Sequence, residues 1–319
     1  MASSLNKREE LIRKRTMNNE QSSSSEINLK NKSIERISSP NEMFNDAVRG
    51  DVVTIDLSFN RLTRIDASIF RDLFNLRFVY LNNNRLVEIA ADLFHELFEL
   101  VSVNLSLNKL TILDTNLFFS NTNLAEVNLS FNRLSSVNVK LFKNCVNLRM
   151  LRLDGNRIEH IPSYAFETLV MLERLYLSYN QLEQLSKYLF KKCIRLKELY
   201  LNNNQLNELD ATQFDYCVDL VKLDLSNNAL SGIEPGTFDK CTKLKELGLF
   251  NNRFESLSST LFRSLSSSSL QTLWLDTEQT GRFLSQFDPD TMSKVVARDM
   301  EKQRVVKYYL VEQFQEEKA

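Results

Sequence analysis

The sequence is poor in the residues that build phosphate-binding loops, metal sites and disulfide frameworks: it has 6 glycines, 4 cysteines and 2 histidines among 319 residues. No G-x-G-x-x-G or Walker-type string occurs, and neither does H-E-x-x-H or G-x-S-x-G. The two histidines, His95 and His160, fall in different repeats of the pattern described below. These absences predict a protein that is not an enzyme, with no catalytic residues, no cofactor and no metal site.

The sequence also lacks an excess of charge and a long apolar run. Its 40 lysines and arginines nearly balance 41 aspartates and glutamates, for a net charge of -1, whereas a nucleic-acid-binding protein is expected to be strongly basic. No apolar stretch reaches the roughly 18 residues that a membrane-spanning helix needs. The N-terminal segment MASSLNKREELIRKR is charged where a signal peptide is apolar. We therefore expect no nucleic-acid partner, no membrane insertion and a cytoplasmic location.

What the sequence does contain is an internal repeat of 24 residues. It reads L-x-x-L-x-L-x-x-N, and its first full unit starts at Val52. Nine full units follow one another, and a tenth strand pattern, LQTLWLD, begins at Leu270. Two columns are unbroken through all nine units: asparagine at 60, 84, 108, 132, 156, 180, 204, 228 and 252, and phenylalanine at 70, 94, 118, 142, 166, 190, 214, 238 and 262.

The repeat predicts a solenoid, because one unit cannot bury its own leucines and must stack on the next. The L-x-L segment of each unit predicts a short parallel strand, about 4.8 Å from its neighbours. The asparagine side chains can bond backbone groups from coil to coil, and the phenylalanine rings can fill the far side of each coil. We therefore expect one solenoid domain over residues 52–277.

The four cysteines share one position of the repeat. Leucine holds the same position in other units, for example at Leu73 and Leu169, which predicts that the thiols act as small buried apolar groups. A strained disulfide or a metal site between consecutive coils is the alternative. The cysteines are Cys145, Cys193, Cys217 and Cys241.

Both ends depart from the repeat. Residues 1–23 are polar and charged and predict a disordered tail. Residues 24–51 predict a degenerate N-terminal capping repeat, with Lys32 in place of the asparagine. Residues 278–319 predict a helical cap, because an apolar stripe at helical spacing runs from near Asp290 to about Gln315. This helix would cover the last coil, or it would dock a partner or a second copy of the chain.

These motifs resemble the leucine-rich repeat superfamily, in its typical 24-residue class without cysteine-rich caps. The resemblance covers residues 52–276. It implies an α/β fold, a horseshoe solenoid with a parallel β-sheet on its concave side. It also implies protein recognition, without a cofactor. In this reading the repeat gives a mode of action but not the identity of the partner.

The strand residues that point away from the core carry the candidate binding site. Fold maintenance asks nothing of these positions, since asparagine or serine serves there in some units, yet repeats five to eight place tyrosine and charged residues on them. Tyrosine and arginine are common in interface hot spots. The predicted partner-binding residues are Arg152, Arg174, Tyr176, Glu198, Tyr200, Lys222 and Asp224, with Phe250 and Trp274 as a secondary site. The alternative is a solvated ladder of cross-strand pairs, worth about 0.2–1 kcal/mol each.

Three functions follow from these expectations. The first is a non-catalytic scaffold that binds a protein partner on its concave face. The second is a recognition or regulatory subunit of an enzyme complex, engaged through the C-terminal helix. The third is an extracellular, immune-type recognition protein.

Overall fold

The computed structural model of the chain describes residues 25–37, 50–255, 257, 261 and 270–276, together with the backbone of residues 295–299 and 304–307. The chain forms two compact units, Met1–Arg152 (unit 1) and Leu153–Ala319 (unit 2). Both units repeat the same short coil. The predicted tail, residues 1–23, lies outside the described residues.

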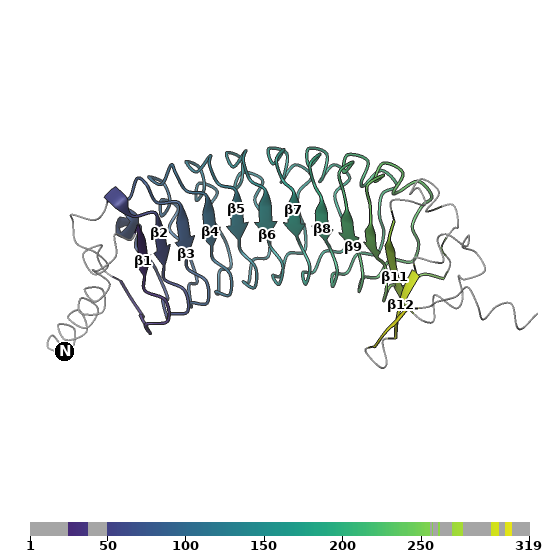
Figure 1. Cartoon of the computed structure of the whole chain (residues 1–319), viewed down its shortest axis with the longest axis horizontal. Coiled ribbons are helices and arrows are strands. Elements are labelled where there is room, and N and C mark those ends of the chain that lie inside the picture. The colour runs from purple at the N-terminus through teal and green to yellow at the C-terminus, as the bar shows by residue number, and fades with distance from the viewer. Residues whose placement is uncertain are drawn as a thin grey trace, which may run out of the picture. The chain divides into compact units, whose positions relative to one another are not determined.

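Unit 1 is a stack of parallel strands, one for each coil (Figure 1). Each strand pairs with the next in register, so that Thr54 faces Phe78 and Phe78 faces Ser102. A single turn of 3-10 helix, η3 (Ala67–Phe70), lies on the return path of one coil. The strands are β1 (Glu26–Asn28), β2 (Thr54–Asp56), β3 (Phe78–Tyr80), β4 (Ser102–Asn104), β5 (Glu126–Asn128) and β6 (Met150–Arg152).

Unit 2 continues the pattern and ends differently. Its strands from β7 to β12 pair in parallel and in register. The last pair differs, because β12 and β13 are antiparallel. The strands are β7 (Arg174–Tyr176), β8 (Glu198–Tyr200), β9 (Lys222–Asp224), β10 (Glu246–Gly248), β11 (Thr272–Asp276), β12 (Val295–Asp299) and β13 (Arg304–Lys307). The predicted solenoid of parallel strands, one for each 24-residue repeat, is confirmed.

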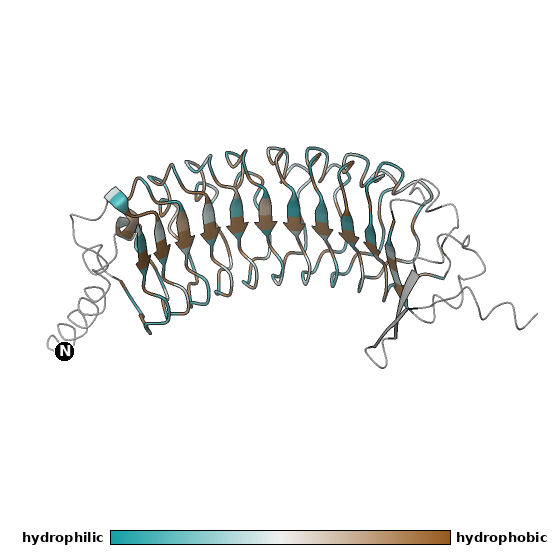
Figure 2. Ribbon diagram, viewed as in Figure 1, coloured by the Kyte–Doolittle hydropathy of each residue, from teal (hydrophilic) through white to brown (hydrophobic). Residues whose placement is uncertain are grey.

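The core of each unit is made by the leucine and phenylalanine columns. Figure 2 shows hydrophobic residues recurring from coil to coil along the strands. Strand leucines such as Leu175 and Leu177 are fully buried. The phenylalanine rings stack from coil to coil: the centroids of Phe94 and Phe118 lie 5.8 Å apart, and those of Phe190 and Phe214 lie 6.1 Å apart. Each buried ring contributes roughly 1.5–3 kcal/mol, and stacking links that contribution to the neighbouring coil.

The asparagine column forms the predicted ladder. Asn180 donates from Nδ2 to the carbonyl oxygen of Leu177 in its own coil, at 3.0 Å, and to that of Leu153 in the preceding coil, at 2.9 Å. Its Oδ1 accepts from the backbone N–H of Ile158 at 3.0 Å. One side chain thus satisfies buried polar groups of two coils, which would otherwise be costly to bury.

The N-terminal coil joins this ladder without an asparagine of its own. Residues 25–37 carry β1 and bury Leu29 and Ile34. Asn60 of the next coil accepts from the backbone N–H groups of Lys32 and Ile34, at 3.0 Å each. The following coil therefore completes the backbone of this degenerate one.

The predicted C-terminal helix is wrong over the stretches that the structure describes, because residues 295–299 and 304–307 are strands. Two physical reasons favour strands here. The edge of β11 offers backbone groups that need partners, and β12 takes them in register, with Leu273 facing Val295. The two strands also contain the β-branched residues Val295, Val296, Val305 and Val306, which prefer strands. A partner-binding or self-associating helix over 290–315 is therefore not available at these positions.

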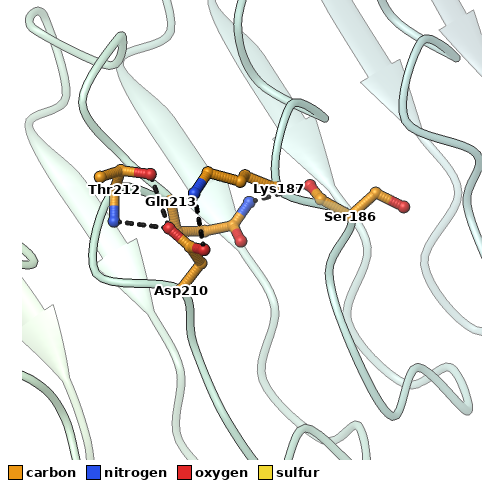
Figure 3. A network of polar contacts seen from close by, with 5 residues as sticks. All are labelled: Ser186, Lys187, Asp210, Thr212 and Gln213. Atoms are coloured by element: carbon orange, nitrogen blue, oxygen red, sulfur yellow. Dashed lines mark hydrogen bonds and ion pairs between the residues drawn. The ribbon is translucent and has the colours of Figure 1, made fainter.

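Short polar turns fix the return path of the coils. In unit 2, Asp210 Oδ1 accepts from the backbone N–H of Thr212 at 2.9 Å and from its hydroxyl at 2.6 Å (Figure 3). Lys187 of the preceding coil reaches Asp210 at 3.2 Å, and Gln213 Nε2 donates to the carbonyl of Ser186 at 3.2 Å. The hydrogen bonds from Thr212, more than Lys187, hold the pKa of Asp210 below its usual value.

The four cysteines are free and fully buried. Burial raises the pKa of Cys145, Cys193 and Cys241 from 9.0 to about 12, and it raises that of Cys217 as well. The thiols therefore stay protonated and behave as the apolar groups that the sequence predicts.

This burial predicts a loss of stability at alkaline pH. Below pH 9 the Cys193 thiol is protonated in both the folded and the unfolded chain. Its contribution to the free energy of unfolding is therefore independent of pH in this range. Between its unfolded and folded pKa values only the unfolded chain releases the proton, so stability falls by about 1.4 kcal/mol per pH unit for each thiol. Between about pH 8 and about pH 10 we expect urea denaturation under reducing conditions to show that Cys193→Ala loses about 1.4 kcal/mol less than the wild type. If the wild type and Cys193→Ala lose the same stability between these pH values, the explanation is contradicted.

Candidate partner-binding face

The strands position the candidate residues by simple alternation. Each three-residue strand turns its central residue into the core and its two outer residues to the opposite side of the sheet. That side is called the open face here, and it corresponds to the concave side in the sequence prediction. In unit 2 the register places Arg174 beside Glu198 and Glu198 beside Lys222. The second row places Tyr176 beside Tyr200. All of these side chains are half-buried.

The two tyrosines form one aromatic surface. The ring centroids of Tyr176 and Tyr200 lie 4.8 Å apart, with 6° between the ring planes. Lys222 Nζ lies 5.6 Å from the Tyr200 ring centroid, so a cation flanks the pair. Each such contact is worth about 0.5–1.5 kcal/mol. The side chains therefore hold a fixed arrangement before any partner arrives.

The Tyr200 hydroxyl is a permanent donor. It donates to Glu198 Oε2 at 3.2 Å. Desolvation by the surrounding side chains, and then the Glu198 carboxylate, raise the pKa of Tyr200 well above its usual value. The phenol consequently stays neutral at any physiological pH.

An ion pair closes the charged row on β10. Lys222 Nζ lies 2.7 Å from Glu246 Oε2. The row across β7 to β10 therefore alternates in sign: Arg174, Glu198, Lys222, Glu246. Sequence reasoning missed Glu246, although it stands one repeat after Lys222 in the same column.

Gly248 makes room for its neighbours at the end of the tyrosine row. A Cβ atom at this position would lie 2.5 Å from Asp224 Oδ1 and 2.7 Å from Ser226 Oγ. Asp224 Oδ1 also accepts from the backbone N–H of Ser226 at 3.0 Å. Any side chain at position 248 would displace Asp224 or Ser226, so the tyrosine row ends here at a residue without a side chain.

The remaining predicted residues lie on or next to other strands. Arg152 belongs to unit 1, where it is half-buried on β6 and faces Asn128 in register. In the secondary site, Trp274 is half-buried and faces Gly248, but Phe250 is only 8% exposed. Phe250 therefore offers a partner little contact area. The structure brings six of the seven primary residues together on β7, β8 and β9 of unit 2.

The open face of unit 2 presents aromatic and charged side chains. Among the residues that the structure describes, no group of three histidine, cysteine, aspartate or glutamate side chains is placed to hold a metal ion. Within the same described residues, no helix combines the length and the apolar character needed to cross a bilayer. The open face of unit 2 offers aromatic area and alternating charge.

Comparison with family models identifies the repeat. The model described as "Leucine rich repeat" matches residues 51–110, 74–134, 98–158, 122–182, 146–206 and 194–254. Together these ranges cover most of the chain. None of the curated proteins matches the sequence.

Solved structures share the fold. A chain of the Toll–Spatzle complex of Drosophila aligns with a TM-score of 0.70 and 23% identity over 84% of this chain and 36% of that one. A chain from the octameric complex of Latrophilin 3, Unc5D and FLRT2 gives 0.64 and 26%, covering 83% of both chains. The functional domain of InlJ from Listeria monocytogenes gives 0.60 and 22%, over 79% and 48%. The chain spans less than half the length of the Toll and InlJ chains.

Proposed function

Because the chain belongs to the leucine-rich repeat family, we propose that it is a non-catalytic scaffold that recognises a protein partner on the open face of unit 2. The observation that carries the proposal is the stacked pair Tyr176 and Tyr200 beside a row of alternating charge. Tyrosine supplies large contact area at low conformational cost, and such residues dominate interface hot spots. The Toll and FLRT2 structures, which are complexes with other proteins, support the same general mode of action.

The residues chosen at these positions support recognition over stability. The equivalent positions in β4 and β5 of unit 1 hold Asn104 and Asn128, whose side-chain oxygens accept from the hydroxyl groups of serines two residues later. The coil thus folds with a small polar residue at this place. Half-buried tyrosines are not required there by the fold, which favours a binding role.

The test is a pull-down from native lysate that compares the wild type with the double variant Tyr176→Asn, Tyr200→Asn. Asparagine is chosen because it holds this position in two coils of unit 1, at Asn104 and Asn128. Each hot-spot ring is worth about 2 kcal/mol or more, so we expect at least about thirty-fold weaker binding of the captured partner for each ring removed. Binding is then measured with the purified partner by calorimetry.

A matched control removes two tyrosines elsewhere. Tyr164 and Tyr188 are 55% and 43% exposed in the same unit and lie outside its strands. Tyr164→Asn with Tyr188→Asn should melt like the wild type and keep the partner. A partner retained equally by both double variants would rule out the open face as its site.

A cytoplasmic location is part of this proposal. Four buried free thiols suit a reducing compartment, where such groups remain unpaired. Mass spectrometry of the native protein tests this point. Glycans at Asn104 or Asn128, each in an N-L-S sequence, would instead favour the extracellular recognition role.

A further inference from the structure

A recurring backbone position marks a second surface. The residue just before each ladder asparagine has a positive φ, as in Asn83 (57°) and Asn203 (56°). In this left-handed region the Cβ atom of an ordinary residue crowds the following carbonyl, whereas glycine and asparagine tolerate it. The repeat accordingly uses asparagine at 83, 203, 227 and 251, and glycine at 155.

Four coils break this rule with bulky side chains. Phe59, Leu107, Phe131 and Tyr179 adopt φ values of 53–56°. These residues are 47–57% exposed, so packing covers only about half of their surface. Strain held at an exposed apolar residue indicates a role outside folding. Three of the four belong to unit 1.

A line of cations accompanies the three in unit 1. The residue just after each ladder asparagine is basic in four consecutive coils, and all four side chains are exposed: Arg61, Arg85, Lys109 and Arg133. None of them has an ion-pair partner within the described residues. The same column in unit 2 holds Gln181, Gln205 and Ala229 besides two arginines. The four cations of unit 1 are therefore available to a ligand.

The apolar and basic columns border one hollow. Leu107 and Phe131 line it together with Arg85, Lys109 and Arg133, and its volume is ≈ 450 Å³. Ladder asparagines form its floor. The two columns are called the strand-exit strip here, because each residue lies a few positions after a strand of unit 1 ends.

We propose that the strand-exit strip of unit 1 binds an acidic segment of a partner protein that also carries bulky apolar side chains. The line of unpaired cations calls for carboxylates, and the exposed Leu107 and Phe131 call for apolar groups beside them. Coils repeat about every 4.8 Å, so a segment that runs across them meets a cation and an apolar contact in turn.

A single-stranded nucleic acid fits this surface less well. Leu107 has no ring on which a base can stack. The strands that lead into the strip also carry acidic residues on the open face, Asp56 and Glu126, and these repel a continuous phosphate backbone. A peptide with a few carboxylates can keep to the strip and avoid them.

The first step of the test selects peptides from a random display library on the full-length chain. The proposal expects sequences enriched both in aspartate or glutamate and in leucine, phenylalanine or tryptophan. A selection without an acidic bias would overturn it. The strongest selected peptide, labelled with fluorescein, then serves as the probe for fluorescence polarisation.

The second step uses Leu107→Asn with Phe131→Asn, since asparagine already fills this position at Asn83. We expect the probe to bind about tenfold or more weakly, while the melting temperature stays equal or rises because the backbone strain is relieved. Tyr179→Asn is the matched control: it relieves the same strain in unit 2 and should leave probe binding unchanged. Unchanged affinity of the double variant, or a lower melting temperature, would refute the proposal.

The third step separates charge from apolar contact and protein from nucleic acid. Arg85→Gln with Lys109→Gln introduces the residue that unit 2 has at Gln181 and Gln205, and it should weaken the probe and flatten its salt dependence. A fluorescein-labelled oligouridylate is the second probe. If it binds the wild type and not this variant, and no acidic peptide is selected, the strip is a nucleic-acid site instead. The Tyr176→Asn, Tyr200→Asn variant should bind the peptide like the wild type, so this result stands apart from the proposed function.

Discussion

Replacing Phe118 with alanine is expected to lower the free energy of unfolding by about 3–5 kcal/mol. The side chain is fully buried, and its ring centroid lies 5.8 Å from that of Phe94 and 6.0 Å from that of Phe142. Removing the ring takes contacts from two neighbouring coils at once. The void cannot close easily, because backbone hydrogen bonds fix the spacing of the coils. Urea denaturation of the full chain measures the loss.

The adjacent residue provides the control for this experiment. Phe119 is 59% exposed, so Phe119→Ala makes the same chemical change one position away without opening a cavity. Its free energy of unfolding should stay within about 0.5 kcal/mol of the wild type. If both variants lose the same stability, the cause is the local chain conformation and not the stacked rings.

Asn180→Ala is expected to lower the free energy of unfolding by about 1–3 kcal/mol, for a different reason. The change leaves the Ile158 N–H without its acceptor, whereas the carbonyl oxygens of Leu153 and Leu177 keep Asn156 and Asn204 as donors. Each buried polar group that loses its partner costs about 1–3 kcal/mol. Because these groups lie in two coils, hydrogen exchange should increase at the Ile158 amide as well as near residue 180.

Asn207→Ala separates this effect from the loss of any asparagine. Asn207 is exposed, and its position lies outside the ladder column. The variant should keep its stability within about 0.5 kcal/mol of the wild type. Slow exchange at Ile158 in Asn180→Ala would contradict the role assigned to the ladder.

The sequence predicts the repeating part of the fold because each column answers one physical need. Leucine at positions such as 175 and 177 fills the core, Asn180 satisfies the backbone, and Phe118 fills the far side. A pattern that recurs at a fixed spacing leaves little choice of register. For the same reason the outward residues of β7, β8 and β9 could be assigned to one face.

The rest of the structure depends on contacts between residues that the repeat pattern of the sequence does not reveal. The residues after Asp290 show helical spacing, but an unpaired strand edge and β-branched residues such as Val295 decide for strands. The pairing of Lys222 with Glu246 depends on rotamers, and the need for glycine at 248 depends on the close approach of Asp224. The positive φ of Phe59 and Leu107 is visible only in the backbone, since most aromatic or leucine residues avoid it.

The asparagine ladder makes the two directions along the stack of coils inequivalent. Each asparagine completes the backbone of the coil before it, as Asn60 does for residues 32 and 34 and Asn180 does for Leu153 and Ile158. A coil thus depends on its successor more than on its predecessor. The N-terminal coil can therefore dispense with an asparagine of its own. At the other end, Asp276 takes the place of a backbone carbonyl: its carboxylate accepts from the backbone N–H of Asn251 at 2.8 and 2.9 Å, whereas the equivalent N–H of Asn227 bonds the carbonyl oxygen of Phe250.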